Sequence, residues 1–203
     1  MERKNNIENQ MQALKHHFPF LSDDVLYALL MMGIHLLGNK IPFMVVGSIA
    51  WKALGLPLNR EIKDIDIEIV CNDEEKLLLF ENICKEQGSK LHLDEENDIT
   101  HFEHKPYVFY AFGIEFNIWV SKKTFFHKKS VSCGGILIPT VDEVVGIKAQ
   151  YHRPKDLEDL LGLSKALMSM ICGEENLDKF MDKINISEIE KIILKDESDT
   201  GEK

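Results

Sequence analysis

The segment that decides the fold is residues 43–70, FMVVGSIAWKALGLPLNREIKDIDIEIV. It opens with an apolar run at 43–46, breaks at Gly47 and Ser48 into a helix-like stretch, and ends at 64–69 in a run where acids alternate with isoleucine. Successive side chains of a strand point to opposite faces, so the acids share one face and the isoleucines share the other. The pattern predicts a strand with one face in the core and a row of carboxylates on the other.

Two of these carboxylates, Asp64 and Asp66, are spaced to bind a metal ion. Their Cα atoms lie roughly 6–7 Å apart on a strand, so both side chains can reach one cation or two adjacent cations. Oxygen ligands of this kind suit Mg²⁺ or Mn²⁺. Gly47 lets the backbone approach a phosphate closely, Ser48 offers a hydroxyl and the helix start offers free N–H groups. With the guanidinium of Arg60 added, the segment predicts phosphoryl or nucleotidyl transfer.

The order of these residues resembles the nucleotidyltransferase superfamily to which DNA polymerase β belongs. Within it, the form Arg60-x-x-Lys63-Asp64-x-Asp66 is most similar to AbiEii-type abortive-infection toxins and to the small antibiotic nucleotidyltransferases. A second patch agrees: Lys148 followed by residues 152–160, HRPKDLEDL, is similar to a Lys-then-Arg-x-Lys-Asp-x-x-Asp-Leu segment that follows the catalytic domain in those proteins. The resemblance covers about residues 42–161.

This resemblance implies a fold and a reaction. The fold would be of the α/β (α+β) class, a nucleotidyltransferase-like mixed β-sheet flanked by helices. Asp64 and Asp66 would hold Mg²⁺ or Mn²⁺, and an NTP would be the substrate, with its NMP moved to a hydroxyl of a small molecule, a protein or an RNA end. The nucleotide would be bound by Gly47, Ser48, Arg60, Lys63 and Lys148. For Lys148, a plain surface lysine is an equally weighted interpretation.

One position departs from the superfamily pattern. Members usually carry a third acid on a neighbouring strand, and the matching run here, residues 113–120, GIEFNIWV, places Asn117 there. An asparagine can ligate a metal through its carbonyl oxygen but cannot accept a proton. Glu115 lies on the same predicted face and is a candidate substitute, with Glu68 as a more distant candidate, and either Glu115 or Asn117 would complete the site where the acceptor hydroxyl binds. The sequence therefore does not decide which residue takes the role of the third acid, which in the superfamily acts on the acceptor hydroxyl.

The chain divides into four predicted segments. Residues 1–40 form an N-terminal helical arm, 41–152 the nucleotidyltransferase-like catalytic domain, 153–195 a helical tail packed on it, and 196–203 a disordered tail without apolar residues. A chain of 203 residues with 44% hydrophobic content supports one domain with such a helical appendage.

Charge and cysteine content limit the partners and the compartment. A formal net charge of -10 argues against an extensive nucleic-acid surface. A local RNA contact would use the basic cluster at residues 122–129, although a solvated turn with two buried aromatics is the favoured interpretation there. Scattered cysteines without CxxC spacing indicate reduced thiols, and no segment is long and apolar enough for a bilayer or a leader. We expect a cytoplasmic protein without a membrane partner.

Two other classes of function compete with transfer. The chain is a degenerate, nucleotide-binding member without transfer activity if Asn117 has removed the needed acid. It is an interaction protein if its apolar helix near residues 25–37 docks on a partner, as in the toxin half of a toxin–antitoxin pair with an antitoxin-like protein.

Overall fold

A mixed β-sheet positions everything else in the molecule. The computed structural model describes residues 2–86, 92–93, 105–151 and 153–172. Within them the main sheet has five strands in the order β1-β2-β5-β4-β3. Their bounds are β1 Phe43–Val45, β2 Asp64–Val70, β3 His92–Leu93, β4 Lys105–Ala111 and β5 Ile114–Ser121. β2 and β5 pair in parallel, and the other neighbours pair antiparallel, which confirms the predicted α/β class with a mixed sheet.

The central strand β2 has the two faces that its sequence predicts. Ile65, Ile67 and Ile69 are fully buried on the core face. On the other face, Asp64 stands opposite Glu115 of β5 and Asp66 stands opposite Asn117. The parallel register therefore brings the predicted carboxylate row beside the predicted third position.

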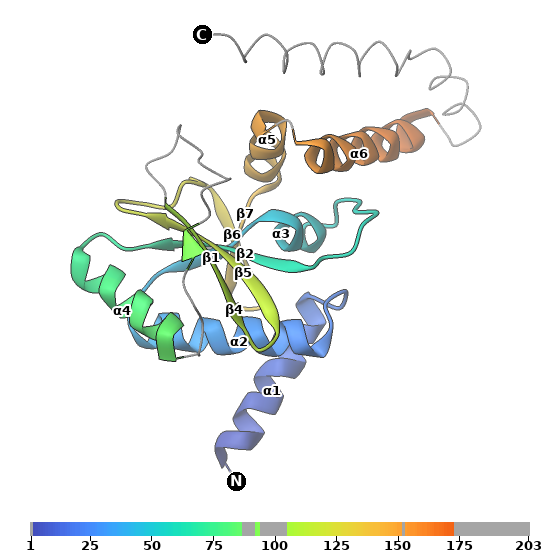
Figure 1. Ribbon diagram of the computed structural model, residues 1–203. Helices are drawn as coiled ribbons and strands as arrows, with labels where there is room; N and C mark the ends of the chain where they lie inside the picture. The colour runs from blue at the N-terminus through green and yellow to red at the C-terminus, as the bar shows by residue number, and fades with distance from the viewer. Residues whose placement is uncertain (1, 87–91, 94–104, 152, 173–203) are drawn as a thin grey trace, which may run out of the picture.

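Helices cover both faces of the sheet. α2 (Asp23–Gly38) and α4 (Glu74–Glu86) lie on the side of the buried isoleucines, and α5 (Val141–Tyr151) and α6 (Pro154–Cys172) lie on the opposite side (Figure 1). Both α2 and α4 lie where apolar residues at helical spacing predict helices. Ser22 accepts a hydrogen bond from the Val25 N–H at 3.4 Å and caps α2, as its position before two acids predicts.

The N-terminal helices are part of the main core. α1 (Glu2–His17) contributes Leu14, and Phe18 follows it; both belong to the same buried cluster as Leu29 of α2 and Ile67 of β2. The segment predicted as a helical arm thus shares its apolar contacts with the sheet. The domain boundaries themselves remain predictions.

A separate hairpin follows the main sheet. β6 (Ser130–Cys133) pairs antiparallel with β7 (Ile136–Pro139). The sequence predicts β7, whose Ile136 and Ile138 are buried, but not β6. The side chains of Ser130, Val131 and Ser132 are exposed, so β6 lacks the apolar alternation by which a strand is recognised.

Two helix segments border the polar face of the sheet. α3 (Gly47–Ala53) starts where the predicted break occurs, and a single residue separates it from the end of β1.

α6 is described as far as Cys172, so the predicted tail beyond it and the predicted disorder at 196–203 lie outside the described residues. Within the described part of the chain, none of the helices combines the length and the hydropathy that a membrane crossing needs.

Candidate functional site

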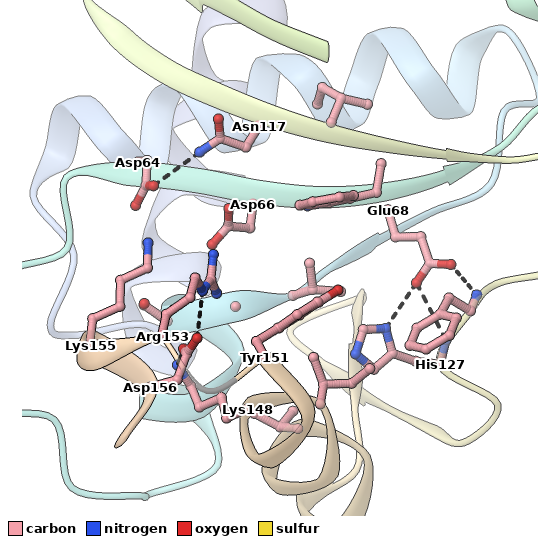
Figure 2. Close-up of a pocket in the computed structure, with 18 of the residues that line it drawn as sticks. Asp64, Asp66, Glu68, Asn117, His127, Lys148, Tyr151, Arg153, Lys155 and Asp156 are labelled. Atoms are coloured by element: carbon pink, nitrogen blue, oxygen red, sulfur yellow. Dashed lines mark hydrogen bonds and ion pairs between the residues drawn. The ribbon is translucent and has the colours of Figure 1, made fainter. Parts of the chain in front are cut away.

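A cavity of about 330 Å³ lies between the polar face of the sheet and the helices α5 and α6. Side chains from β2, β5, the turn before α3, the loop after β5, α5 and the start of α6 line it (Figure 2). Of the site residues that the sequence predicts, eight line this cavity: Gly47, Ser48, Arg60, Asp64, Asp66, Glu115, Asn117 and Lys148. The ninth, Lys63, is exposed and is not among the residues that line the cavity, and its nucleotide-binding role stays a prediction.

The predicted third position holds a hydrogen-bond donor. Asn117 Nδ2 donates to Asp64 Oδ2 at 3.0 Å. Two residues earlier on β5, Glu115 accepts a hydrogen bond from the Tyr110 hydroxyl. Asn117 therefore orients one carboxylate of the pair, while Glu115 remains the acid on β5 that faces the cavity.

Asp66 lies directly against the turn that begins α3. Gly47 has φ +63°, and a Cβ placed on it would lie 2.0 Å from Asp66 Oδ2. The turn is also tied to β2 through the backbone, because the Val46 N–H donates to the carbonyl oxygen of Asp66 at 3.0 Å. Only glycine satisfies both the left-handed conformation and the close approach of the carboxylate. Glycine is therefore needed at position 47 for a second purpose besides the predicted close approach of a phosphate, because any side chain there would collide with Asp66.

Burial and the neighbouring charges together set the pKa of Asp66. The net pKa is raised to about 6, mainly by burial and also by the neighbouring Asp64 carboxylate. The cations of Lys155 and Arg153 and the Asn117 amide lower it. Figure 2 shows Lys155 and Arg153 directed toward the two aspartates from the start of α6. The pair of carboxylates is thus held at a cost in electrostatic energy that a cation between them would relieve.

We expect Asp66→Asn to stabilise the metal-free protein. Asp66 protonates at a higher pH in the folded state than in the unfolded chain, so its contribution to stability is present below about pH 4 and is lost as the pH rises through 6. Urea denaturation in EDTA should show the variant about 2–3 kcal/mol more stable at pH 7.5, with no difference at pH 4. Glu158→Gln, at an exposed position of α6, is the control. A pH-independent difference would contradict the assignment of the shift to Asp66.

A buried ionic network joins α5 and α6 to the α3 turn. Arg60 Nη2 donates to Ser48 Oγ at 2.6 Å and pairs with Asp159 Oδ2 at 3.1 Å. Lys148 Nζ pairs with Asp159 Oδ2 at 2.8 Å and with Asp156 Oδ1 at 2.9 Å, and Arg153 Nε pairs with Asp156 Oδ2 at 2.5 Å. Arg60 Nε is buried without a hydrogen-bond partner among the described residues. Ser48 and Arg60 are therefore held in place by α6.

Lys148 is not a surface lysine. It is 5% exposed, its ammonium lies 5.4 Å from the centroid of the Trp51 ring, and both of its ion-pair partners are buried. Asp156 and Asp159 are the residues that neutralise it. Its predicted contact with nucleotide phosphates stays a prediction.

The contact between Glu68 and His127 has no signal in the sequence. At the end of the cavity away from Asp64, Glu68 accepts hydrogen bonds from the backbone N–H groups of Phe126 and His127, and lies 2.9 Å from His127 Nδ1. His127 was expected in a solvated turn, yet it is 8% exposed, while Lys122, Lys123, Lys128 and Lys129 around it are exposed. The pairing joins residues far apart in the chain, and spacing does not reveal such contacts.

The donor set fits a hard cation only in part. In the described ranges, no group of three or more His, Cys, Asp or Glu side chains is arranged to hold a metal ion. Asp64 and Asp66 offer two carboxylates, and magnesium in phosphoryl-transfer sites is held by one or two carboxylates together with substrate phosphates. The pair therefore fits Mg²⁺ or Mn²⁺ arriving with a phosphorylated substrate.

Comparison with known proteins gives a distant likeness to a solved structure. No protein-family model matches the chain, and no curated protein matches it. Among solved structures, it matches a crystal structure provisionally described as a nucleotidyltransferase from H. pylori, with 15% sequence identity and a TM-score of 0.38. The match covers 84% of this chain and 69% of the other. Because the likeness is distant, the proposals that follow rest on the geometry of the cavity.

Proposed function

We propose that the protein is a metal-dependent nucleotidyltransferase that moves an NMP from an NTP to a hydroxyl acceptor. The observation that carries the proposal is the placement of Asp66 against Gly47, with Asp64 beside it and two cations facing the pair. Two acids on one strand face, next to a glycine turn with a serine and an arginine, provide oxygen ligands and phosphate ligands in one cavity.

Asp64 and Asp66 are the residues that would hold Mg²⁺ or Mn²⁺. A divalent cation bound there supplies charge neutralisation at the phosphate oxygens where negative charge develops during the transfer. The raised pKa of Asp66 supports this role, because a carboxylate that is strained by burial and by a like charge gains most from a cation.

The chain's own residues have distinct tasks in this reaction. Ser48 and Arg60 bind the phosphates of the NTP, and Arg153 and Lys155 offset the negative charge on the side of α6. The acceptor oxygen forms a bond to the α-phosphorus while the bond to the β-phosphate oxygen breaks, and pyrophosphate leaves with the electron pair. Glu115 is the acid on the acceptor side that can take the hydroxyl proton, because Asn117 cannot.

A second candidate is nucleotide binding without transfer. It is favoured by one observation: Asn117 uses its amide to hold Asp64, so the position expected to carry a base carries a donor. In this case the same residues would bind a metal–NTP complex, and no bond to the α-phosphorus would form.

Two measurements separate these functions. We expect calorimetry with ATP, CTP, GTP and UTP to show binding of at least one of them in the micromolar to millimolar range with Mg²⁺, and loss of binding in EDTA. Incubation with α-labelled NTPs and with total RNA, protein or small-molecule extracts as acceptors tests transfer. Label in any acceptor supports the transferase, and binding without label supports the second candidate. Absence of binding by all four nucleotides contradicts both.

A further inference from the structure

The Glu68–His127 pair occupies one end of the cavity and has no task in the reaction as described. Glu68 is 1% exposed, and it receives the two backbone N–H groups of the loop after β5 as well as the His127 ring. A carboxylate only accepts hydrogen bonds, so His127 Nδ1 carries the proton that it donates. The ring is therefore fixed in position by a buried acid.

The other ring nitrogen of His127 faces the cavity. Among the described residues Nε2 has no hydrogen-bond partner and is not fully buried, and His127 is one of the residues that line the cavity. Figure 2 shows it on the side of the ring that faces Tyr151. In the neutral ring this nitrogen is a hydrogen-bond acceptor. A ligand atom with an N–H group can reach it.

The walls next to His127 are apolar and aromatic. On α5, Val144, Ile147 and Tyr151 line the cavity at the spacing of one helical face. Across from them, Trp119 of β5 stands opposite Glu68 in the sheet register and also lines the cavity. Burial raises the pKa of Tyr151 to about 12, so its hydroxyl stays protonated near neutral pH. This end differs from the charged end around Asp66 and suits a flat ring with a polar edge.

Once the phosphates and the acceptor are placed in the cavity, one part of its lining is left for the nucleoside. If the phosphates lie at Ser48 and Arg60, and the acceptor approaches from Glu115, then the part of the lining still unassigned is the end around Glu68. Glu68 lies two residues beyond Asp66 on β2, roughly 7 Å along the strand. A ribose spans such a distance between an α-phosphate and a base.

We propose that this end of the cavity binds the nucleobase of the NTP, with His127, held by Glu68, accepting a hydrogen bond from an N–H group on the edge of the base. The inference rests on the proposed function, because it takes the position of the phosphates from it. It adds a specificity-determining residue and a location for the base.

The test compares each NTP with inorganic tripolyphosphate, which has the phosphates and no nucleoside. His127→Asn keeps an amide that can donate to Glu68 and removes the nitrogen that faces the cavity. We expect calorimetry with Mg²⁺ to show that the variant binds the best NTP about tenfold more weakly, the loss of one hydrogen bond, and binds tripolyphosphate within twofold of the wild type. His16→Asn, at an exposed position outside the cavity, should change neither affinity.

A second variant tests the same site without relying on the buried pair. Ile147→Trp adds bulk to the apolar wall at a half-buried position, and Ala149→Trp adds the same bulk on the exposed side of α5. We expect Ile147→Trp alone to lose NTP binding and to retain tripolyphosphate binding.

The outcomes distinguish this inference from the proposed function. The nucleobase site is overturned if His127→Asn and Ile147→Trp weaken the binding of NTP and of tripolyphosphate equally, or if neither variant weakens NTP binding. The proposed phosphate site is unaffected by either result. If the wild-type protein binds neither an NTP nor tripolyphosphate, both are overturned.

Discussion

Asp64→Asn and Asp66→Asn should each abolish nucleotidyl transfer, with a rate loss of at least about a thousandfold. An asparagine keeps the shape of the side chain and removes the negative charge that binds the cation, and a catalytic metal contributes several kcal/mol to the transition state. The measurement is single-turnover incorporation of α-labelled NTP into the acceptor that the wild type labels. The same variants should also lose the Mg²⁺-dependent part of NTP binding in calorimetry.

The expected stability of Asp66→Asn makes its result easy to interpret. Asp66→Asn is expected to be more stable than the wild type at neutral pH, so a loss of transfer cannot be assigned to unfolding. Glu158→Gln, on the exposed side of α6, should transfer label at the wild-type rate. Wild-type rates in either aspartate variant would mean that the metal, or the reaction, lies elsewhere.

Lys148→Met should destabilise the protein by about 3–5 kcal/mol. Removing the ammonium leaves Asp156 and Asp159, both buried, without their shared cation, and an uncompensated buried charge is costly. Arg60 and Arg153 still contact the two acids, so we expect the lower end of this range. Urea denaturation at pH 7.5 measures the effect.

Matched variants separate the buried network from a general effect of losing a lysine. Lys165→Met, at an exposed position of α6, should change stability by less than about 0.5 kcal/mol. Adding Asp156→Asn to Lys148→Met removes one of the stranded charges and should recover part of the loss. Equal stability of the Lys148 and Lys165 variants would show that the network contributes nothing.

The parts of the fold that local patterns encode were predictable from the sequence. The alternation at 64–69 predicts the two faces of β2, and the Ile65–Ile67–Ile69 side is buried as expected. Ser22 before two acids predicts the start of α2, and Gly47-Ser48 after an apolar run predicts the break between β1 and α3. In each case the signal and the structure involve residues close together in the chain.

The parts of the site that depend on distant contacts could not be predicted. The environment of Lys148 is set by how α6 folds back on α5, so its burial is not visible from its own spacing. Glu68 lies on β2 and His127 lies in the loop after β5, far away in the chain. The periodicity of a segment carries no information on such a pair. β6 was missed because its exposed side chains give no alternation. Propensity and periodicity describe segments, whereas these features belong to the packing between segments.

The parallel pairing of β2 with β5 has a consequence for how the protein is made. Parallel neighbours need a long crossover, and here α4, β3 and β4 are synthesised between the two strands. A nascent chain therefore has Asp64 and Asp66 outside the ribosome long before Glu115 and Asn117 can join them, and the anchor of Arg60 on Asp159 comes later still. The cavity closes only when α6 has emerged, so ligands of the cavity have no complete site on the growing chain until late in its translation.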